Sequence, residues 1–271
     1  MQYRLVAIDL DGTLVGRDGK IAEEDKAAVA HLTNNFVQVV LCTGRIFQTT
    51  VPFIEELKLK KHHIMFDGAL IYSPAGRNTM YSLPLQPEVV KEAVEYCRAE
   101  DIHLELYSRD TFFIERAHWS DEIHRNFFRV EPTIASFDGI WDNENLLKAE
   151  MVVGSLDDAQ KAKGFADHFG ERLNFSIAHT PAYPEVEFLN IIHPGVSKGT
   201  ALRFLAKELG YHHTEIVAIG DGMNDISLLK EAGLAIAMGD APDEVKQVSQ
   251  YTTLDVEHHG VAEAIKLFFP G

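Results

Sequence analysis

Two aspartates, two positions apart, end the first apolar run of the chain. Residues 5–14 read LVAIDLDGTL, with Asp9 and Asp11 directly after the run. A short apolar run that stops at turn residues is typical of a buried strand in a parallel sheet, and alternation along the strand places both carboxylates on one side. Two carboxylates held together favour a shared cation or proton. The alternative from this stretch alone is an ordinary strand followed by an Asp-Gly turn.

Two later segments repeat this order of apolar run, polar turn and helical period. They are residues 36–45, FVQVVLCTGR, and residues 215–225, EIVAIGDGMND. The polar residues at their ends are Thr43, Gly44, Arg45, Asp221, Asn224 and Asp225. Because the carboxyl ends of parallel strands open on one edge of the sheet, we expect these groups to converge with the first pair. Arg45 follows the polar turn and could either contact a phosphate or pair with a nearby acid.

A fourth segment, residues 195–210, predicts a helix that brings a lysine to the same edge. Ser197 suits the N-cap, Gly210 suits the position after the helix, and Lys198 falls in the first turn. A cation at this position opposes the helix dipole, which is usual for a solvated surface lysine. If the lysine is directed at the site instead, it would add positive charge where an anion could bind.

Together these side chains predict phosphoryl transfer assisted by a metal ion. Mg²⁺ prefers hard oxygen ligands and usually combines a few carboxylates with substrate phosphate, and Asp9 and Asp221 could supply those carboxylates. A carboxylate can attack phosphorus to form an aspartyl-phosphate, while the second aspartate of the pair protonates the leaving oxygen and later activates water. The groups left to hold the phosphoryl oxygens are Thr43, the amides around Gly44, Lys198 and Asn224.

The four motifs, in this order, resemble those of the haloacid dehalogenase-like phosphatases. They are Asp-x-Asp-Gly-Thr, Thr-Gly-Arg, Ser-Lys-Gly-x-Ala-Leu and Gly-Asp-x-x-Asn-Asp. A large insertion before the lysine motif makes the chain similar to the Cof-type subfamily, which dephosphorylates sugar phosphates and phosphorylated cofactors such as pyridoxal phosphate or FMN. The resemblance covers essentially the whole chain and implies an α/β fold, with a Rossmann-like parallel-sheet core and a large inserted α+β cap.

The resemblance also implies a role for each motif residue. Asp9 is the nucleophile and a Mg²⁺ ligand, Asp11 is the general acid/base and binds the metal through its backbone carbonyl, and Asp221 is the remaining protein ligand. The residues implied to contact the phosphoryl group are Leu10, through its amide, and Thr43, Gly44, Lys198 and Asn224. Asp225 is implied to orient Lys198 or a water molecule on the metal from the second layer of residues.

Two positions depart from the pattern of the subfamily. The third strand is followed by Asp67 and Gly68 where Asn-Gly is usual, and His259 precedes Gly260 where an acidic residue is common. Asp67 adds a negative charge near a site that must accept an anion. We therefore expect it to alter substrate choice or metal affinity.

The middle of the chain has a different pattern from its two ends. We expect residues 1–83 and 190–271 to form the catalytic core, and residues 84–189 to form the inserted α+β cap. Within the cap, the apolar residues of HWSDEIHRNFF, residues 118–128, fall at helical spacing. The cap would lie over the site, exclude bulk water and recognise the leaving group through residues on its loops.

Composition limits the partners and the compartment. A net charge of −16 argues against a sequence-independent surface for nucleic acid or anionic membrane. Two cysteines without a CxxC pair fit a reducing compartment, and no apolar run is long enough to span a membrane. We expect a cytoplasmic monomer or weak homodimer whose partner is a small phosphorylated metabolite.

Two rivals to a phosphoric monoester hydrolase remain open. A phosphomutase of the same fold also uses paired aspartates, but such enzymes resemble the chain less at the second and fourth motifs. A phosphate-binding or receiver-like module without turnover also clusters acids and a lysine on a parallel sheet. Receivers are usually short and lack a large insertion, so the sequence favours the phosphatase.

Overall fold

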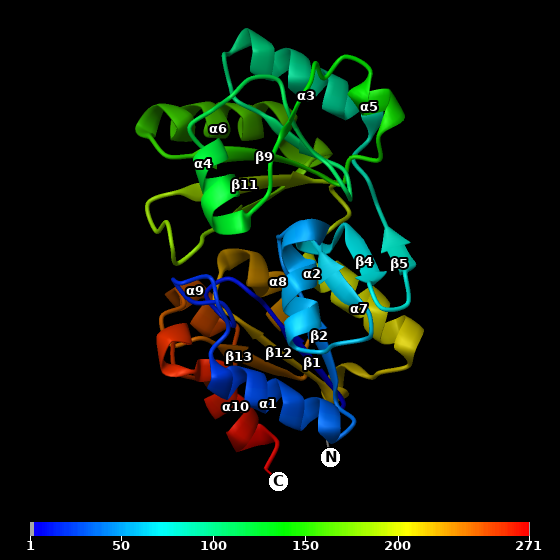
Figure 1. Ribbon diagram of the computed structural model, residues 1–271, viewed down its shortest axis with the longest axis vertical. Helices are drawn as coiled ribbons and strands as arrows, with labels where there is room; N and C mark the ends of the chain where they lie inside the picture. The colour runs from blue at the N-terminus through cyan, green and yellow to red at the C-terminus, as the bar shows by residue number, and fades with distance from the viewer. Residues whose placement is uncertain (1–2, 271) are drawn as a thin grey trace.

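The computed structural model describes residues 3–270, leaving aside the side chain of residue 143, and its two largest sheets lie one above the other (Figure 1). The lower sheet is parallel, in the order β14-β13-β12-β1-β2. Its strands are β1 (Leu5–Ile8), β2 (Gln38–Leu41), β12 (Ile216–Gly220), β13 (Leu234–Ala237) and β14 (Tyr251–Thr252). Every residue of β1, β12 and β13 is buried, as expected for strands covered on both faces.

Helices cover both faces of this sheet. Val6 and Ile8 pack toward one group of helices, whereas Leu5 and Ala7 pack toward the other, because side chains alternate along a strand. The first group is α1 (Glu23–Asn34), α2 (Phe47–Glu56) and α10 (Gly260–Phe268). The second group is α7 (Lys198–Leu209), α8 (Ile226–Leu229) and α9 (Asp243–Gln247). This arrangement confirms the α/β class that the sequence predicts.

A small antiparallel sheet lies beside β2. It is formed by β3 (His63–Met65), β4 (Leu70–Ser73) and β5 (Asn78–Ser82). A parallel bridge between Cys42 and Ile64 joins it to the end of β2. The one-turn helix η1 (Phe66–Gly68) that follows β3 therefore lies near the loop after β2.

The upper part of the molecule, which we call the cap, is built on a second sheet. Its strand order is β10-β11-β9-β6-β7-β8. The strands are β6 (Glu105–Tyr107), β7 (Phe112–Ile114), β8 (Thr133–Ile134), β9 (Lys148–Val153), β10 (Asn174–Ala178) and β11 (Glu187–Ile192). The helices α3 (Pro87–Ala99) and α6 (Leu156–Phe169) cover its outer face, and the short helix α5 (Ile140–Asn143) lies beside α3 (Figure 1). The other face is turned toward the parallel sheet.

The helical spacing over residues 118–128 predicts more regular helix than the structure has. A single α-helical turn, α4 (Asp121–Ile123), runs into the π-helical turn η2 (His124–Phe128). The wider turn puts Phe127 and Phe128 close to the guanidinium of Arg45 in the core. A π turn of this kind inserts a residue into the helical ladder and is frequent at functional sites.

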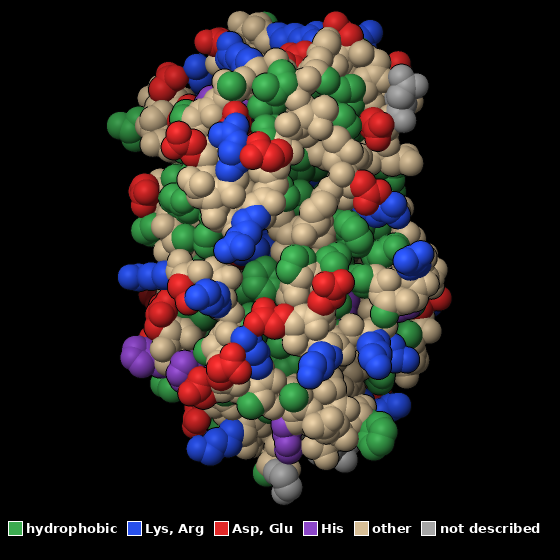
Figure 2. Space-filling model, viewed as in Figure 1, with side chains coloured by type: hydrophobic (Ala, Val, Ile, Leu, Met, Phe, Trp, Pro, Cys, Tyr) green, Lys and Arg blue, Asp and Glu red, His purple; other side chains and the backbone are tan. Residues whose placement is uncertain are grey.

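On the face shown in Figure 2, Lys and Arg side chains are interspersed with Asp and Glu, and they do not form a basic groove. No helix among residues 3–270 combines the length and the apolar character needed to cross a membrane.

We predict that Gly199→Ala destabilises the fold, because α7 begins in close contact with the chain at Ser227. A Cβ on Gly199 would lie 2.2 Å from the Ser227 carbonyl oxygen. We expect a loss of about 1–3 kcal/mol in the free energy of unfolding, measured by urea denaturation.

The matched control is Gly164→Ala in the middle of α6. A Cβ there would meet its nearest atom, the Tyr96 hydroxyl oxygen, at an ordinary 3.4 Å, so alanine should stabilise the helix by about 0.5–1 kcal/mol. Equal effects of the two substitutions would contradict the close approach at Gly199.

Candidate active site

The loop after β1, the turn after β12 and the first turn of α7 bring three charged side chains into contact. Lys198 Nζ donates to Asp9 Oδ1 and to Asp225 Oδ1, each at 2.6 Å. All three side chains are buried. The Ser197 hydroxyl caps α7 by accepting from the Thr200 amide, which fixes the turn from which Lys198 reaches the carboxylates.

Asp225 uses both of its carboxylate oxygens. Its Oδ2 accepts the amides of Asp221 and Gly222 at 3.1 and 3.0 Å, while its Oδ1 accepts from Lys198. The carboxylate therefore holds the loop after β12 and the lysine in a fixed relation to each other.

The charges at this edge are not balanced. Desolvation, and next the repulsion from Asp225, raise the pKa of Asp9 to about 8. Desolvation and the charge of Asp9 also raise the pKa of Asp221 well above its ordinary value. Burial would lower the pKa of Lys198, but the attraction of Asp225 and Asp9 outweighs it and raises that pKa. One ammonium is shared by three carboxyl groups, so a further cation would stabilise their ionised forms.

The acidic cluster has free oxygen donors for a metal ion. Carboxylate oxygens of Asp9, Asp221 and Asp225 lie within 4.8 Å of one another, and both oxygens of Asp225 already accept hydrogen bonds, from Lys198 and from two amides. Asp221 Oδ1 accepts from the Thr13 hydroxyl at 2.8 Å, which leaves Oδ2 available. Hard oxygen donors with excess negative charge fit a divalent cation.

Gly12 makes room for this donor. Its φ is +85°, and a Cβ there would fall 2.3 Å from Asp221 Oδ2. The glycine of the first motif is therefore required both by the turn and by the close approach of the carboxylate.

Asp11 is paired with Arg45. The guanidinium Nε and Nη2 donate to Asp11 Oδ2 and Oδ1 at 2.7 and 2.6 Å. The same guanidinium stacks on Phe53 of the core, 5.0 Å away, and on Phe127 and Phe128 of the cap, at 5.3 and 5.1 Å. Of the two roles that the sequence leaves open for Arg45, the structure shows the pairing with an acid.

The turns after β1 and β2 are neighbours, because the two strands pair in parallel. The Leu10 carbonyl accepts three successive amides, of residues 13–15, at 3.2, 2.9 and 2.7 Å, which closes the first turn. In the second turn the Thr43 hydroxyl accepts the Arg45 amide at 3.0 Å. This hydroxyl keeps its own proton to donate, and Gly44 next to it lines the cavity.

Asp67 links the core to the cap, which the sequence did not predict. Its Oδ1 accepts from Asn224 Nδ2 at 3.1 Å, and its Oδ2 accepts from the Ser176 hydroxyl on β10 at 2.9 Å. Asp67, which stands where the subfamily usually has asparagine, thus connects Asn224, a candidate phosphoryl ligand, to the cap strand β10. The second departure, His259, precedes α10, with its Nε2 3.7 Å from Glu24.

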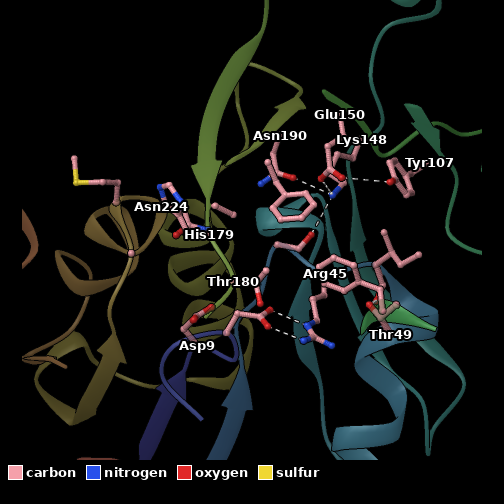
Figure 3. Close-up of a pocket in the computed structure, with 18 of the residues that line it drawn as sticks. Asp9, Arg45, Thr49, Tyr107, Lys148, Glu150, His179, Thr180, Asn190 and Asn224 are labelled. Carbon is pink, nitrogen blue, oxygen red and sulfur yellow. Dashed lines mark hydrogen bonds and ion pairs between the residues drawn. The ribbon is translucent and has the colours of Figure 1, made fainter. Parts of the chain in front are cut away.

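A cavity of about 170 Å³ lies over the sheet edge, between the core and the cap (Figure 3). The predicted site residues that line it are Asp9, Asp11, Gly44, Asp221 and Asn224. Lys198 and Asp225 are buried next to Asp9. The cap residues that line it include Tyr107, His124, Phe128, Lys148, Glu150, Thr180, Phe188 and Asn190.

Sequence reasoning missed the cap residues of this cavity. It placed the recognition of the leaving group on cap loops, and the loop residue Thr180 does line the cavity, but Lys148, Glu150 and Asn190 line it from the strands β9 and β11. The signal that could have found the first two is alternation, because KAEMVV, residues 148–153, carries charged residues at alternate positions of an otherwise apolar strand.

Comparisons with known proteins identify the family. A model of the haloacid dehalogenase-like hydrolases matches residues 6–265. A Bacillus subtilis protein named 5-amino-6-(5-phospho-D-ribitylamino)uracil phosphatase YitU is 27% identical over 98% of this chain and 97% of its own. Phosphatase YwpJ of the same organism is 26% identical over 97% of this chain and 99% of its own.

A solved structure shares the fold over nearly the whole length. It is a haloacid dehalogenase-like hydrolase from Bacteroides thetaiotaomicron, with a TM-score of 0.85, 25% identity, and coverage of 98% of this chain and 100% of that one. With the motifs gathered at one sheet edge under a cap, the chain belongs to the haloacid dehalogenase-like hydrolases, as a phosphatase of the Cof type.

Proposed function

We propose that this phosphatase depends on Mg²⁺ and hydrolyses small phosphorylated metabolites through an aspartyl-phosphate on Asp9. The observation that supports this most is the salt bridge of Lys198 with Asp9 and Asp225, 2.6 Å on each side. It holds Asp9 Oδ1, while Asp9 Oδ2 has no hydrogen-bond partner among residues 3–270. The carboxylate also lines the cavity, so one oxygen remains for a phosphorus atom.

In the first step, a carboxylate oxygen of Asp9 attacks phosphorus, the bond from phosphorus to the leaving oxygen breaks, and Asp11 gives that oxygen its proton. In the second step, Asp11 takes a proton from water, whose oxygen attacks phosphorus and releases Asp9 and inorganic phosphate. The salt bridge with Arg45 holds Asp11 at the cavity. Before the proton moves, one Asp11 oxygen must lose its hydrogen bond to Arg45 and form one to the leaving oxygen of the substrate.

The remaining motif residues bind the transferring group. The donors proposed for the phosphoryl oxygens are the Lys198 ammonium, the Asn224 amide, the Thr43 hydroxyl and the amides of Leu10 and Gly44. When bound by Asp9, Asp221 and the Asp11 carbonyl, Mg²⁺ would supply Lewis-acid stabilisation of phosphoryl charge. Asp225 would orient Lys198 through the salt bridge.

The candidate substrates are sugar phosphates and phosphorylated cofactors such as pyridoxal phosphate or FMN. A phosphomutase would instead move the phosphoryl group within a sugar without net release of phosphate. A receiver-like module would keep its acylphosphate far longer than a catalytic cycle. Phosphate release over many turnovers separates the phosphatase from both.

We predict that Asp9→Asn lowers kcat by at least about a thousandfold, because the amide is a far poorer nucleophile than the carboxylate. Phosphate release from p-nitrophenyl phosphate with Mg²⁺ measures this, and circular dichroism checks that the fold is kept. The matched control is Asp157→Asn at the exposed start of α6, which should leave kcat unchanged. Turnover of the Asp9 variant within about tenfold of the wild type would remove the nucleophile assignment.

A second prediction concerns the metal and does not depend on turnover. Mg²⁺ should stabilise the folded protein, because it binds the folded carboxylates and relieves their repulsion. At a concentration of a hundred times its Kd, it should add about 2.7 kcal/mol to the free energy of unfolding and so raise the Tm. Asp221→Asn should lose most of this shift, whereas Asp157→Asn should keep it. Differential scanning fluorimetry with Mg²⁺ or chelator gives the measurement, and an equal shift in both variants would place the metal elsewhere.

A further inference from the structure

The inner face of the cap sheet carries a buried polar array of Lys148, Glu150 and Asn190. Lys148 Nζ donates to Glu150 Oε2 at 2.5 Å and to Asn190 Oδ1 at 2.9 Å (Figure 3). Each of the three residues is at most 4% exposed. Lys148 Nζ also lies 3.5 Å from the Gly44 carbonyl oxygen of the core, so the array lies next to the loop that is proposed to bind phosphate.

The apolar core of the cap does not include this array. The alternate residues Ala149, Met151 and Leu189 turn to the outer face and join the apolar core beneath α3 and α6. A buried lysine–glutamate pair is often no more stable than apolar residues of the same size, because both charges must be desolvated. Polar residues kept on the face toward the cavity therefore point to a ligand.

The array has an unused hydrogen-bond donor. A lysine ammonium only donates, so Asn190 must present its oxygen to Lys148, and its NH₂ group is left over. Asn190 Nδ2 has no hydrogen-bond partner among residues 3–270. The Thr180 hydroxyl, which belongs to another cap residue of the cavity lining, is buried and also has no partner in the described chain. Buried polar groups normally have hydrogen-bond partners. A bound molecule would supply the partners that these two groups lack.

The charges select against an anionic leaving group. Among the described lining residues, the permanently charged cations are Arg45 and Lys148, and each is already paired, with Asp11 and with Glu150. A carboxylate or second phosphate on the leaving group would find no unpaired lysine or arginine among these residues. Hydroxyl groups, which both donate and accept, match the free NH₂ of Asn190 and the unpaired Thr180 hydroxyl.

The cavity also limits the size of the leaving group. Its volume of about 170 Å³ is below the range of about 300–1,000 Å³ usual for pockets that hold drug-sized ligands. Phe128 and Phe188 supply apolar walls that suit the carbon face of a compact molecule. Among the candidate substrates, this favours a short hydroxylated chain over a nucleotide or flavin.

We propose that Asn190, held in place by Lys148 and Glu150, recognises hydroxyl groups on a compact, uncharged polyol leaving group. This inference rests on the proposed phosphatase function and adds the residues that determine its specificity. The position of these residues on strands implies a rigid recognition surface, because a strand holds its side chains more precisely than a loop.

The test compares two substrates that differ only in hydroxyl groups, ribitol 5-phosphate and n-pentyl phosphate, with p-nitrophenyl phosphate as a general substrate. The kcat/KM ratio of the first two is measured for the wild type, Asn190→Leu and Asn190→Asp. The aspartate variant keeps an acceptor for Lys148 and the shape of the side chain, so it protects the test if the leucine variant fails to fold. Asn126→Leu, at an exposed position of η2, is the matched control.

We expect the wild type to prefer ribitol 5-phosphate, and we expect both Asn190 variants to lower the ratio by about tenfold or more, with no change in Asn126→Leu. A uniform loss for both substrates would indicate a merely structural role and overturn the inference. So would a wild-type ratio near one, or hydrolysis of p-nitrophenyl phosphate alone. Failure of the phosphatase proposal has a different signature, the absence of phosphate release from all three substrates, and the inference falls with it.

Discussion

The salt bridge of Lys198 with Asp9 and Asp225 is the interaction on which the site depends. It joins the first turn of α7 to the end of β1 and to the turn after β12 through one ammonium group, at 2.6 Å on each side. Removing one partner of such a buried pair leaves an uncompensated charge and typically costs about 3–5 kcal/mol. Because Asp221 adds a further carboxylate, the bridge leaves the edge with negative charge. The same residues thus stabilise the fold and form the reaction site. A bound cation would reduce the repulsion between the carboxylates and so favour both.

The cap reaches this site through contacts that each involve a residue at the reaction edge. Arg45 lies between Asp11 and the cap rings Phe127 and Phe128, Lys148 approaches the Gly44 carbonyl, and Asp67 binds Ser176. Movement of the cap would break these contacts together. Closure that completes a site and excludes water is a general way to couple substrate binding to chemistry.

The sequence predicts the features that depend on local order along the chain. Apolar runs that end in Asp9, Thr43 and Asp221 specify buried parallel strands, and their shared direction brings the polar ends together. It does not predict contacts between elements far apart in the chain. The sequence shows that Asp67 differs from the residue usual in the subfamily. It does not show the hydrogen bonds of Asp67 to Asn224 and Ser176, because these depend on how η1, η5 (Met223–Asp225) and β10 pack. The π turn at residues 124–128 likewise follows from tertiary packing that overrides helical spacing.

The most direct test of the account is to trap the phosphorylated enzyme during turnover. The reaction with Mg²⁺ and a hydrolysed substrate is quenched with acid, the protein is reduced with borohydride, and peptides are mapped by mass spectrometry. Reduction of an aspartyl-phosphate yields homoserine, so the account predicts homoserine at position 9, in the presence of substrate and absent with chelator. Homoserine at another aspartate, or none while phosphate is being released, would contradict the assignment of Asp9 as nucleophile.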